Sequence, residues 1–159
     1  MRILMVCTAN ICRSPTAEAV MRHRLGRAGL RERIQLDSAG TRAGSTPMPA
    51  DPRSIAHAAR RGYDLTPLRS RPIMRADFDR FDLVVPMDRG HVTQLAALMP
   101  GPTTAQVRLM MSFARIKGLS DEVPDPYYGG AAGFEHVLDL VELACDGLLE
   151  YLYSPQGSR

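Results

Sequence analysis

Short apolar runs alternate along this chain with segments whose apolar residues recur at helical spacing. Strands are predicted at four places: residues 3–6, 34–38, 82–86 and 107–111. Helical periodicity occurs at four others: residues 15–28, 53–61, 88–99 and 134–152. Two stretches rich in glycine and proline, 41–52 and 120–133, are typical of loops, and a loop as long as the second often carries function.

Residues at the ends of these segments support the boundaries. Ser14 is a common capping residue and Pro15 suits a first helical position, so we expect the first helix to start there. Gly29 and Gly62 follow the first two helices, as expected where a helix stops. Pro100 ends the third.

Strands that alternate with helices predict an α/β fold, with a parallel sheet covered by helices on both faces. A length of 159 residues allows one sizeable core. We expect a single domain at residues 1–153 and a disordered tail at 154–159. Ligands of such sheets bind beyond the carboxyl ends of the strands, so the segment after the first strand is a candidate site.

Composition excludes several classes of protein. The net charge of +3 is mild and the arginines are scattered, which favours solvated helix faces over a nucleic-acid surface. No apolar run approaches the roughly 20 residues that span a bilayer, and residues 1–6 are too short for a signal peptide, so we expect a cytoplasmic protein without a membrane span. Three cysteines do not make a secreted disulfide framework. The four histidines lack partners at ligand spacing, so no metal is predicted.

The segment that follows the first strand carries the most specific chemistry. Cys7 and Arg13, separated by five residues, can close a loop around one tetrahedral oxyanion. Backbone N–H groups line such a loop, and the next helix directs its positive end at the centre. The thiolate is the nucleophilic form of cysteine, and the planar guanidinium holds two phosphoryl oxygens at once. This pattern indicates phosphate-ester chemistry at a cysteine, although a structural cysteine before an ordinary helix has the same spacing.

Two further residues suit this loop. Asn10 tolerates the left-handed backbone conformation that a loop with inward N–H groups requires. Ser14 could donate a hydrogen bond to the Cys7 sulfur and assist its departure from a phosphocysteine.

The long loop near the C-terminus offers a proton donor. Asp125 lies between two prolines that stiffen its backbone, and departure of a phenolate or alkoxide needs such an acid. Tyr127 and Tyr128 could form an aromatic wall for a planar leaving group. A simple turn explains the same residues.

Taken together, these segments resemble the low-molecular-weight protein tyrosine phosphatases. Five segments carry the resemblance, in that family's order and over nearly the whole chain: VCTANICRSP (6–15), DSAGT (37–41), PADPR (49–53), FDLVVPMD (81–88) and VPDPYYG (123–129). The resemblance implies a four-stranded parallel sheet flanked by helices, with the phosphate-binding loop after the first strand and no metal or cofactor.

The resemblance also assigns roles to residues. Cys7 would be the nucleophile, Arg13 the phosphate clamp, and Asp125 the general acid and later base. The implied partners are a phosphotyrosine-containing protein and inorganic phosphate, as product and inhibitor; the oligomeric state is undetermined, with a monomer expected. The remaining residues assigned to the phosphate-binding loop, its pocket and its support are Thr8, Ala9, Asn10, Ile11, Cys12, Ser14, Ser38, Tyr127 and Tyr128.

Several positions depart from the family pattern. Ala9 replaces a usual glycine; if that position needs a positive φ, alanine is strained by roughly 1–2 kcal/mol, which predicts a slower enzyme or a different backbone path. Leu68 stands where many members have a network histidine, and His91 where they have asparagine. Residues 42–44 lack the aromatic residue often found at the pocket rim. These changes weaken any inference about substrate preference.

Two residues of the loop bear on substrate and regulation. Ile11 favours phosphotyrosine, because members specialised for phosphoarginine have threonine there and a branched apolar side chain packs against an aryl ring. By resemblance, Cys12 could form a reversible disulfide with Cys7; a buried small hydrophobe is the equal alternative. Cys145 is expected in the core.

Three alternative functions remain open. An arsenate reductase shares this fold, but residues 80–92 contain no cysteine for its redox relay. A phosphoarginine phosphatase is disfavoured by Ile11. A weak phospho-binding module would explain Ala9, but it has no use for the combination of Cys7, Arg13 and Asp125.

Overall fold

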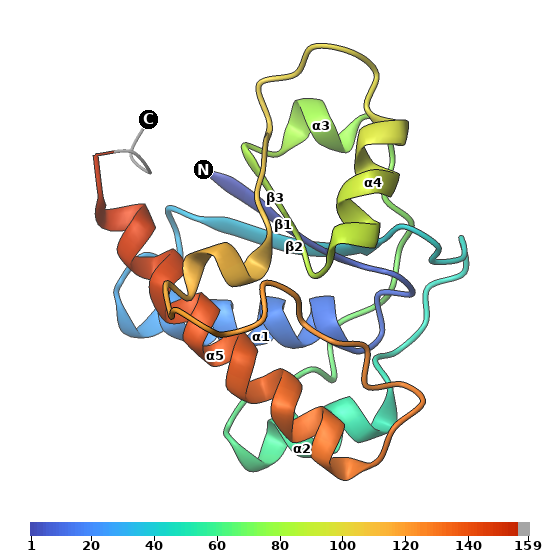
Figure 1. Cartoon of the computed structure of the whole chain (residues 1–159), viewed down its shortest axis with the longest axis vertical. Coiled ribbons are helices and arrows are strands. Elements are labelled where there is room, and N and C mark those ends of the chain that lie inside the picture. Colours follow the sequence, from blue (N-terminus) through green and yellow to red (C-terminus); the bar gives the residue numbers. More distant parts are fainter. Residues whose placement is uncertain (156–159) are drawn as a thin grey trace.

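Four parallel strands form the sheet, in the spatial order β2-β1-β3-β4 (Figure 1). The structure is a computed structural model that describes residues 1–155. The strands are β1 (Arg2–Cys7), β2 (Gln35–Gly40), β3 (Leu83–Pro86) and β4 (Gln106–Val107). Because β1 is an inner strand, the loop that follows it lies near the middle of the sheet's carboxyl edge.

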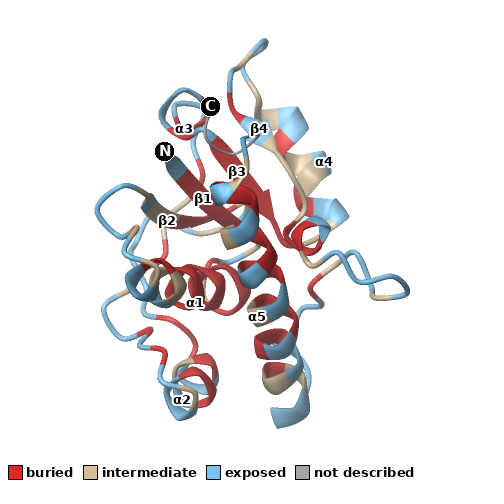
Figure 2. Ribbon diagram, turned by 90° about the vertical axis from the view of Figure 1, so that its left-hand side faces the viewer, coloured by how far each residue is buried: buried red, intermediate tan, exposed pale blue. Residues whose placement is uncertain are grey.

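Helices cover both faces of the sheet. They are α1 (Arg13–Arg27), α2 (Pro52–Arg60), α3 (Asp77–Arg80), α4 (Arg89–Leu98), the 3-10 helix η1 (Met110–Phe113) and α5 (Ala131–Tyr153). Helices α1, α2 and α5 lie on one side and α3 and α4 on the other (Figure 1). Figure 2 shows that buried residues are concentrated in the strands and on the facing sides of α1 and α5.

Side chains that point alternately to the two faces of the sheet explain why the core consists of two clusters. In β1, Ile3 and Met5 belong to the core cluster shared with α1 and α5, whereas Leu4 and Val6 belong to the cluster beneath α3 and α4. All four side chains are fully buried. Successive side chains of a strand point to opposite faces, so an apolar run without polar interruptions is required for a sheet covered on both sides.

The predicted fold class is confirmed, as are the first three strands and the four longer helices within a few residues. The fourth strand was placed wrongly, because the apolar run at 107–111 leaves the sheet after Val107 and continues into η1. This turn packs against α5 so closely that a Cβ on Gly147 would lie 1.8 Å from the carbonyl oxygen of Phe113. Helix α3 was not predicted; four residues are too few to show a periodicity.

The start of α1 also differs from the prediction. Cys12 is the N-cap, α1 begins at Arg13, and no side chain caps it. Ser14 is therefore the second helical residue and Pro15 the third. In the first turn of a helix, backbone N–H groups have no intrahelical acceptor. The missing N–H of Pro15 therefore costs no helical hydrogen bond, and neither residue disturbs the helix. The Ser14 hydroxyl is left for the loop that precedes the helix.

Most of the expected tail, residues 156–159, lies outside the described residues. In the described part of the chain, no helix combines the length and apolar character needed to cross a membrane.

Candidate active site

The phosphate-binding loop, residues 7–14, is held in place by the end of β2. The Thr41 N–H donates to the Cys7 carbonyl and the Arg42 N–H to the Thr8 carbonyl, both at 2.9 Å. This close approach depends on Gly40, because a Cβ there would lie 2.4 Å from the Thr8 oxygen. The glycine of the 37–41 segment is thus needed for packing against the loop.

Cys7 is buried at the base of the loop, with its sulfur 3.0 Å from the Ser14 hydroxyl. The Asn10 side-chain amide donates to that hydroxyl oxygen at 2.7 Å. The Ser14 proton is therefore available to the Cys7 sulfur, as the sequence suggested. The Arg71 N–H donates to the Asn10 side-chain oxygen at 3.0 Å and so orients its amide.

The backbone of the loop corrects the expectation for Ala9. The positive φ falls on Asn10, at 59°, and not on Ala9. Asparagine tolerates this conformation better than most residues, so the left-handed residue is the one predicted. Alanine at position 9 carries no such strain, so backbone strain at Ala9 gives no reason to expect a slower enzyme.

Arg13 is buried, and its two terminal nitrogens have separate partners. Nη1 donates to Asp88 Oδ2 at 2.8 Å and to the Val123 carbonyl at 3.0 Å, while Nη2 donates to Thr8 Oγ1 at 3.3 Å. Burial by itself would raise the pKa of Asp88, but hydrogen bonds from Arg13 and the His91 N–H hold that pKa below its usual value. Asp88 is ionised at neutral pH and fixes the guanidinium.

Sequence reasoning assigned Asp88 only the start of α4. Its side chain accepts the His91 N–H at 3.0 Å and does cap the helix. Its position just beyond the carboxyl end of β3 was the signal for its second role, because that edge of a parallel sheet carries the ligand site.

Asp125, in the loop that precedes α5, lines the same pocket. Its Oδ2 lies 3.7 Å from Arg13 Nη2, and its side chain is 46% exposed. Oδ1 accepts the Tyr127 N–H at 3.1 Å, which stiffens the loop. The pocket, of about 300 Å³, is lined by residues of two segments: Cys7, Thr8, Ala9, Ile11, Cys12, Arg13, Asp125, Tyr127 and Tyr128.

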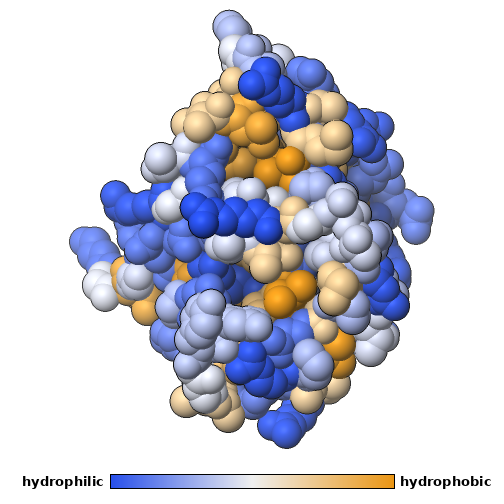
Figure 3. Space-filling model, turned by 90° about the vertical axis from the view of Figure 1, so that its right-hand side faces the viewer, coloured by the Kyte–Doolittle hydropathy of each residue, from blue (hydrophilic) through white to orange (hydrophobic). Residues whose placement is uncertain are grey.

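The two tyrosines form one wall of this pocket. Their rings pack edge to face with centroids 4.9 Å apart, and Tyr128 is 92% exposed. Arg53 of α2 donates to the Tyr127 carbonyl at 3.0 Å and is itself held by Asp51. The face that carries the carboxyl ends of the strands shows small apolar areas within a broadly hydrophilic surface (Figure 3).

Comparison with known proteins agrees with this geometry. The family model described as low molecular weight phosphotyrosine protein phosphatase matches residues 2–156. The chain belongs to this family.

Relatives of this phosphatase include a Streptomyces coelicolor low molecular weight protein-tyrosine-phosphatase, 47% identical over 150 residues that cover 93% of this chain and 91% of that protein. A crystal structure of protein tyrosine phosphatase from Entamoeba histolytica is 39% identical, with a TM-score of 0.89 and 96% of each chain covered. A Drosophila arginine phosphatase is 29% identical, with a TM-score of 0.88, 98% of this chain and 99% of that one covered. The fold therefore serves phosphatases named for different substrates.

Ser38 of the phosphatase does not reach the loop. Its hydroxyl donates to Glu18 Oε2 of α1 at 2.6 Å, with both residues buried. The expected support of the loop by Ser38 is thus limited to tying β2 to the helix that begins at the loop. The network bond to Asn10 comes instead from the Arg71 backbone, a donor that no side-chain pattern could reveal.

Cys12 lies in the wall of the pocket and is buried. Burial raises the pKa of its thiol to about 12, although a hydrogen bond with Ser54 acts in the opposite direction. Cys12 is thus a thiol, not a thiolate, at neutral pH. Cys145 is fully buried in α5 and belongs to the core, as predicted.

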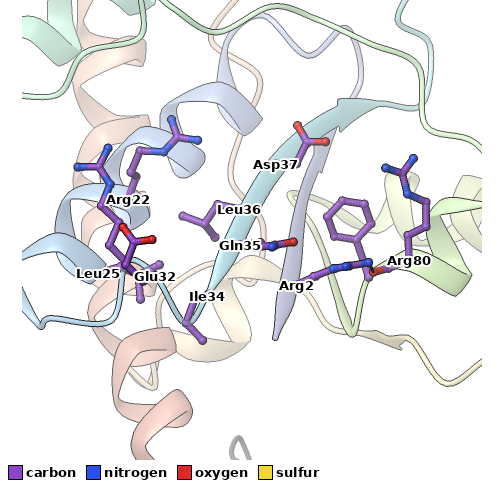
Figure 4. A pocket seen from close by; sticks show the side chains of 11 residues that line it. Arg2, Arg22, Leu25, Glu32, Ile34, Gln35, Leu36, Asp37 and Arg80 are labelled. Carbon is purple, nitrogen blue, oxygen red and sulfur yellow. Dashed lines mark hydrogen bonds between the residues drawn. The ribbon is translucent and has the colours of Figure 1, made fainter.

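A larger hollow of about 560 Å³ lies at the opposite end of the sheet (Figure 4). It is lined by the first residues of β1 and β2, Arg2 and Gln35, and by Arg22, Arg80 and Asp37. Its lining contains no cysteine, and its labelled arginines lie on opposite sides of it (Figure 4). The smaller pocket is the one that contains Cys7, Arg13 and Asp125. No cluster of three or more potential metal-binding side chains occurs within residues 1–155.

Proposed function

We propose that this phosphatase hydrolyses phosphotyrosine in proteins through a phosphocysteine intermediate. The phosphoryl group would occupy the loop of residues 7–14, with its oxygens facing the backbone N–H groups and the Arg13 guanidinium. These fixed donors match the charge that spreads over the equatorial oxygens in the transition state. Because Asp88 and Val123 already hold Arg13, little reorganisation is needed when substrate binds.

In the first step the Cys7 thiolate attacks phosphorus, and the bond from phosphorus to the tyrosyl oxygen breaks. Asp125 donates a proton to that oxygen, so tyrosine leaves as a neutral phenol. The exposed position of Asp125 above Arg13 suits a leaving group at the pocket mouth. In the second step, water attacks the phosphocysteine, and the Asp125 carboxylate accepts a proton from that water. The sulfur departs as a thiolate, to which the Ser14 hydroxyl can donate.

One observation carries this proposal: Arg13 donates to two distant segments, at Asp88 and Val123, while it lines the pocket that contains Cys7 and Asp125. A structural cysteine before an ordinary helix needs none of these contacts. Ile11, Tyr127 and Tyr128 give the pocket an apolar wall for an aryl ring, which favours phosphotyrosine over phosphoarginine. Cys145 lies in the core, a poor place for an arsenate-reductase relay.

The proposal extends to the context of the reaction. We propose one phosphatase domain over residues 1–153, acting in the cytoplasm as a monomer on phosphotyrosine-containing proteins. Inorganic phosphate would be both product and competitive inhibitor, because it fits the same loop.

Hydrolysis of p-nitrophenyl phosphate and of matched phosphotyrosine and phosphoarginine peptides tests the function. Cys7→Ser should abolish turnover, and Asp125→Ala should slow it most for poor leaving groups. Asp146→Ala is the matched control and should keep wild-type rates, because Asp146 is an exposed residue of α5 that does not line the pocket. Wild-type turnover by Cys7→Ser would refute the mechanism, and faster turnover of the phosphoarginine peptide would refute the substrate assignment.

A further inference from the structure

Two residues of the phosphate-binding loop and two at the start of α4 form a closed ring of hydrogen bonds. Arg13 Nη1 donates to Asp88 Oδ2 at 2.8 Å, and the Asp88 N–H donates to His91 Nδ1 at 3.2 Å. His91 Nε2 lies 2.8 Å from Thr8 Oγ1, which also accepts from Arg13 Nη2 at 3.3 Å. The ring joins the loop after β1 to the start of α4, and its members His91 and Arg13 are buried.

The backbone N–H of Asp88 determines the direction of the hydrogen bonds that the His91 ring makes. The Asp88 N–H can only donate, and it donates to His91 Nδ1, which therefore accepts. Asp88 Oδ1 also lies 3.2 Å from Nδ1, but it accepts the His91 N–H and makes no hydrogen bond with Nδ1. Burial, opposed by Asp88 and assisted by Arg13, lowers the pKa of His91 to about 4, so its ring is neutral at neutral pH. A neutral ring whose Nδ1 accepts carries its proton on Nε2. His91 therefore donates to Thr8.

The Thr8 hydroxyl thus accepts two hydrogen bonds, from His91 and from Arg13. A hydroxyl has two acceptor sites and one proton, so its proton remains to be donated elsewhere. Within residues 1–155, no acceptor for this proton is found, and Thr8 lines the pocket that contains Cys7. An anionic oxygen bound in that pocket would be an acceptor for it.

We infer that the Thr8 hydroxyl donates to a phosphoryl oxygen of the substrate, and that His91 is the positioning residue that sets the direction of that hydrogen bond. The inference rests on the proposed function and adds a side-chain donor to the backbone amides and Arg13. The direction matters because a hydroxyl that donated to His91 would present lone pairs to the phosphoryl oxygens and repel them.

Binding of inorganic phosphate, measured by calorimetry, tests the donor without requiring turnover. Thr8→Val keeps the shape of the side chain and removes the hydroxyl; we expect phosphate to bind about tenfold more weakly, as for loss of one hydrogen bond to a charged group. Thr8→Ser restores the donor and should bind phosphate within about threefold of wild type. Thr93→Val, at an exposed position of α4, is the matched control.

Variants of His91 test the direction. His91→Gln can accept from the Asp88 N–H and donate to Thr8, so phosphate affinity should be retained within about threefold. His91→Glu can still accept from Asp88, but its carboxylate accepts the Thr8 proton and turns it away from phosphate; we expect about tenfold weaker binding. The added charge acts on phosphate directly as well, so the same change is made in the Thr8→Val protein.

If His91 acts through Thr8, His91→Glu should lose most of its effect in the Thr8→Val background. An equal loss in both backgrounds would show a charge effect alone and overturn the role of His91. Unchanged phosphate affinity in Thr8→Val would overturn the role of Thr8. Both results are separable from failure of the proposed function, which appears as turnover by Cys7→Ser.

Discussion

Arg13 of the phosphate-binding loop and Asp88 at the start of α4 form a partly buried ion pair, with Nη1 2.8 Å from Oδ2. The residues are 75 positions apart in sequence and meet because β1 and β3 are neighbours in the sheet. The carboxylate fixes the plane of the guanidinium, and it also lowers the positive charge that the loop presents to phosphate.

The Asp88→Asn variant separates the fixing of the guanidinium from the effect of the carboxylate charge. The amide keeps the size of the side chain and an oxygen for the His91 N–H, but holds Arg13 less firmly. We expect kcat for p-nitrophenyl phosphate to fall about tenfold, as for one charge-assisted hydrogen bond. The affinity for inorganic phosphate should not weaken, because net charge in the pocket becomes more positive. Parallel losses of kcat and phosphate affinity would contradict this division of roles.

Asp125→Asn should lower kcat by roughly 10²–10⁴-fold, the usual contribution of a general acid. The loss should grow as the leaving group becomes more basic, because an unprotonated phenolate leaves less readily. A series of substituted phenyl phosphates measures this slope. Asp121→Asn, an exposed carboxylate paired with Arg89, is the control. An unchanged slope in Asp125→Asn would exclude the acid role.

The loop backbone predicts losses of stability of different size and cause at two neighbouring positions. Ala9 has no positive φ, so Ala9→Gly should increase neither activity nor stability and should cost about 0.4–1 kcal/mol through the entropy of the unfolded chain. Asn10→Ala should cost at least about 1–2 kcal/mol, because alanine tolerates φ of 59° poorly and the bonds to Ser14 and Arg71 are lost. Urea unfolding measures both changes. A stabilised Ala9→Gly protein would restore the strain hypothesis.

His91 makes stability depend on pH in a defined window. Its pKa falls to about 4 in the folded protein, chiefly through burial, against about 6.5 when unfolded. Between these values the unfolded chain binds more protons, so the contribution of His91 is complete above pH 6.5 and is lost as pH falls toward 4. The loss is about 3 kcal/mol by pH 4, at about 1.4 kcal/mol per pH unit. His91→Gln should lack this component in urea unfolding at pH 7 and pH 4.5; identical pH dependence in both proteins would contradict it.

Cys12 should be unreactive while the protein is folded. Burial raises the pKa of its thiol to about 12, and Cys145 is fully buried. Only a thiolate reacts readily with iodoacetamide. We therefore expect that iodoacetamide at pH 7 does not label the Cys7→Ser protein until denaturant is added, whereas the wild type should take up one label. The intact mass of the protein measures the number of labels. Rapid labelling of folded Cys7→Ser would show that Cys12 is ionised.

The elements that sequence pattern predicts well are those determined by neighbouring residues. The unbroken apolar run at β1 requires a strand covered on both faces, and the spacing of Cys7 and Arg13 around Asn10 predicts a closed anion-binding loop. Each of these depends on backbone geometry over fewer than about ten residues, which local sequence determines. Where the same local rule was applied to Ser14, it failed, because the loop uses the hydroxyl that a cap would have needed.

The environment of the loop was decided only by tertiary structure. Arg13 meets Val123 across 110 positions and Thr8 meets His91 across 83, because the strand order brings the ends of β1 and β3 to one edge. Ser38, on β2, turned toward α1 instead of the loop. Contacts of this kind depend on which strands pair and which side chain faces which, and no periodicity within a single element contains that information.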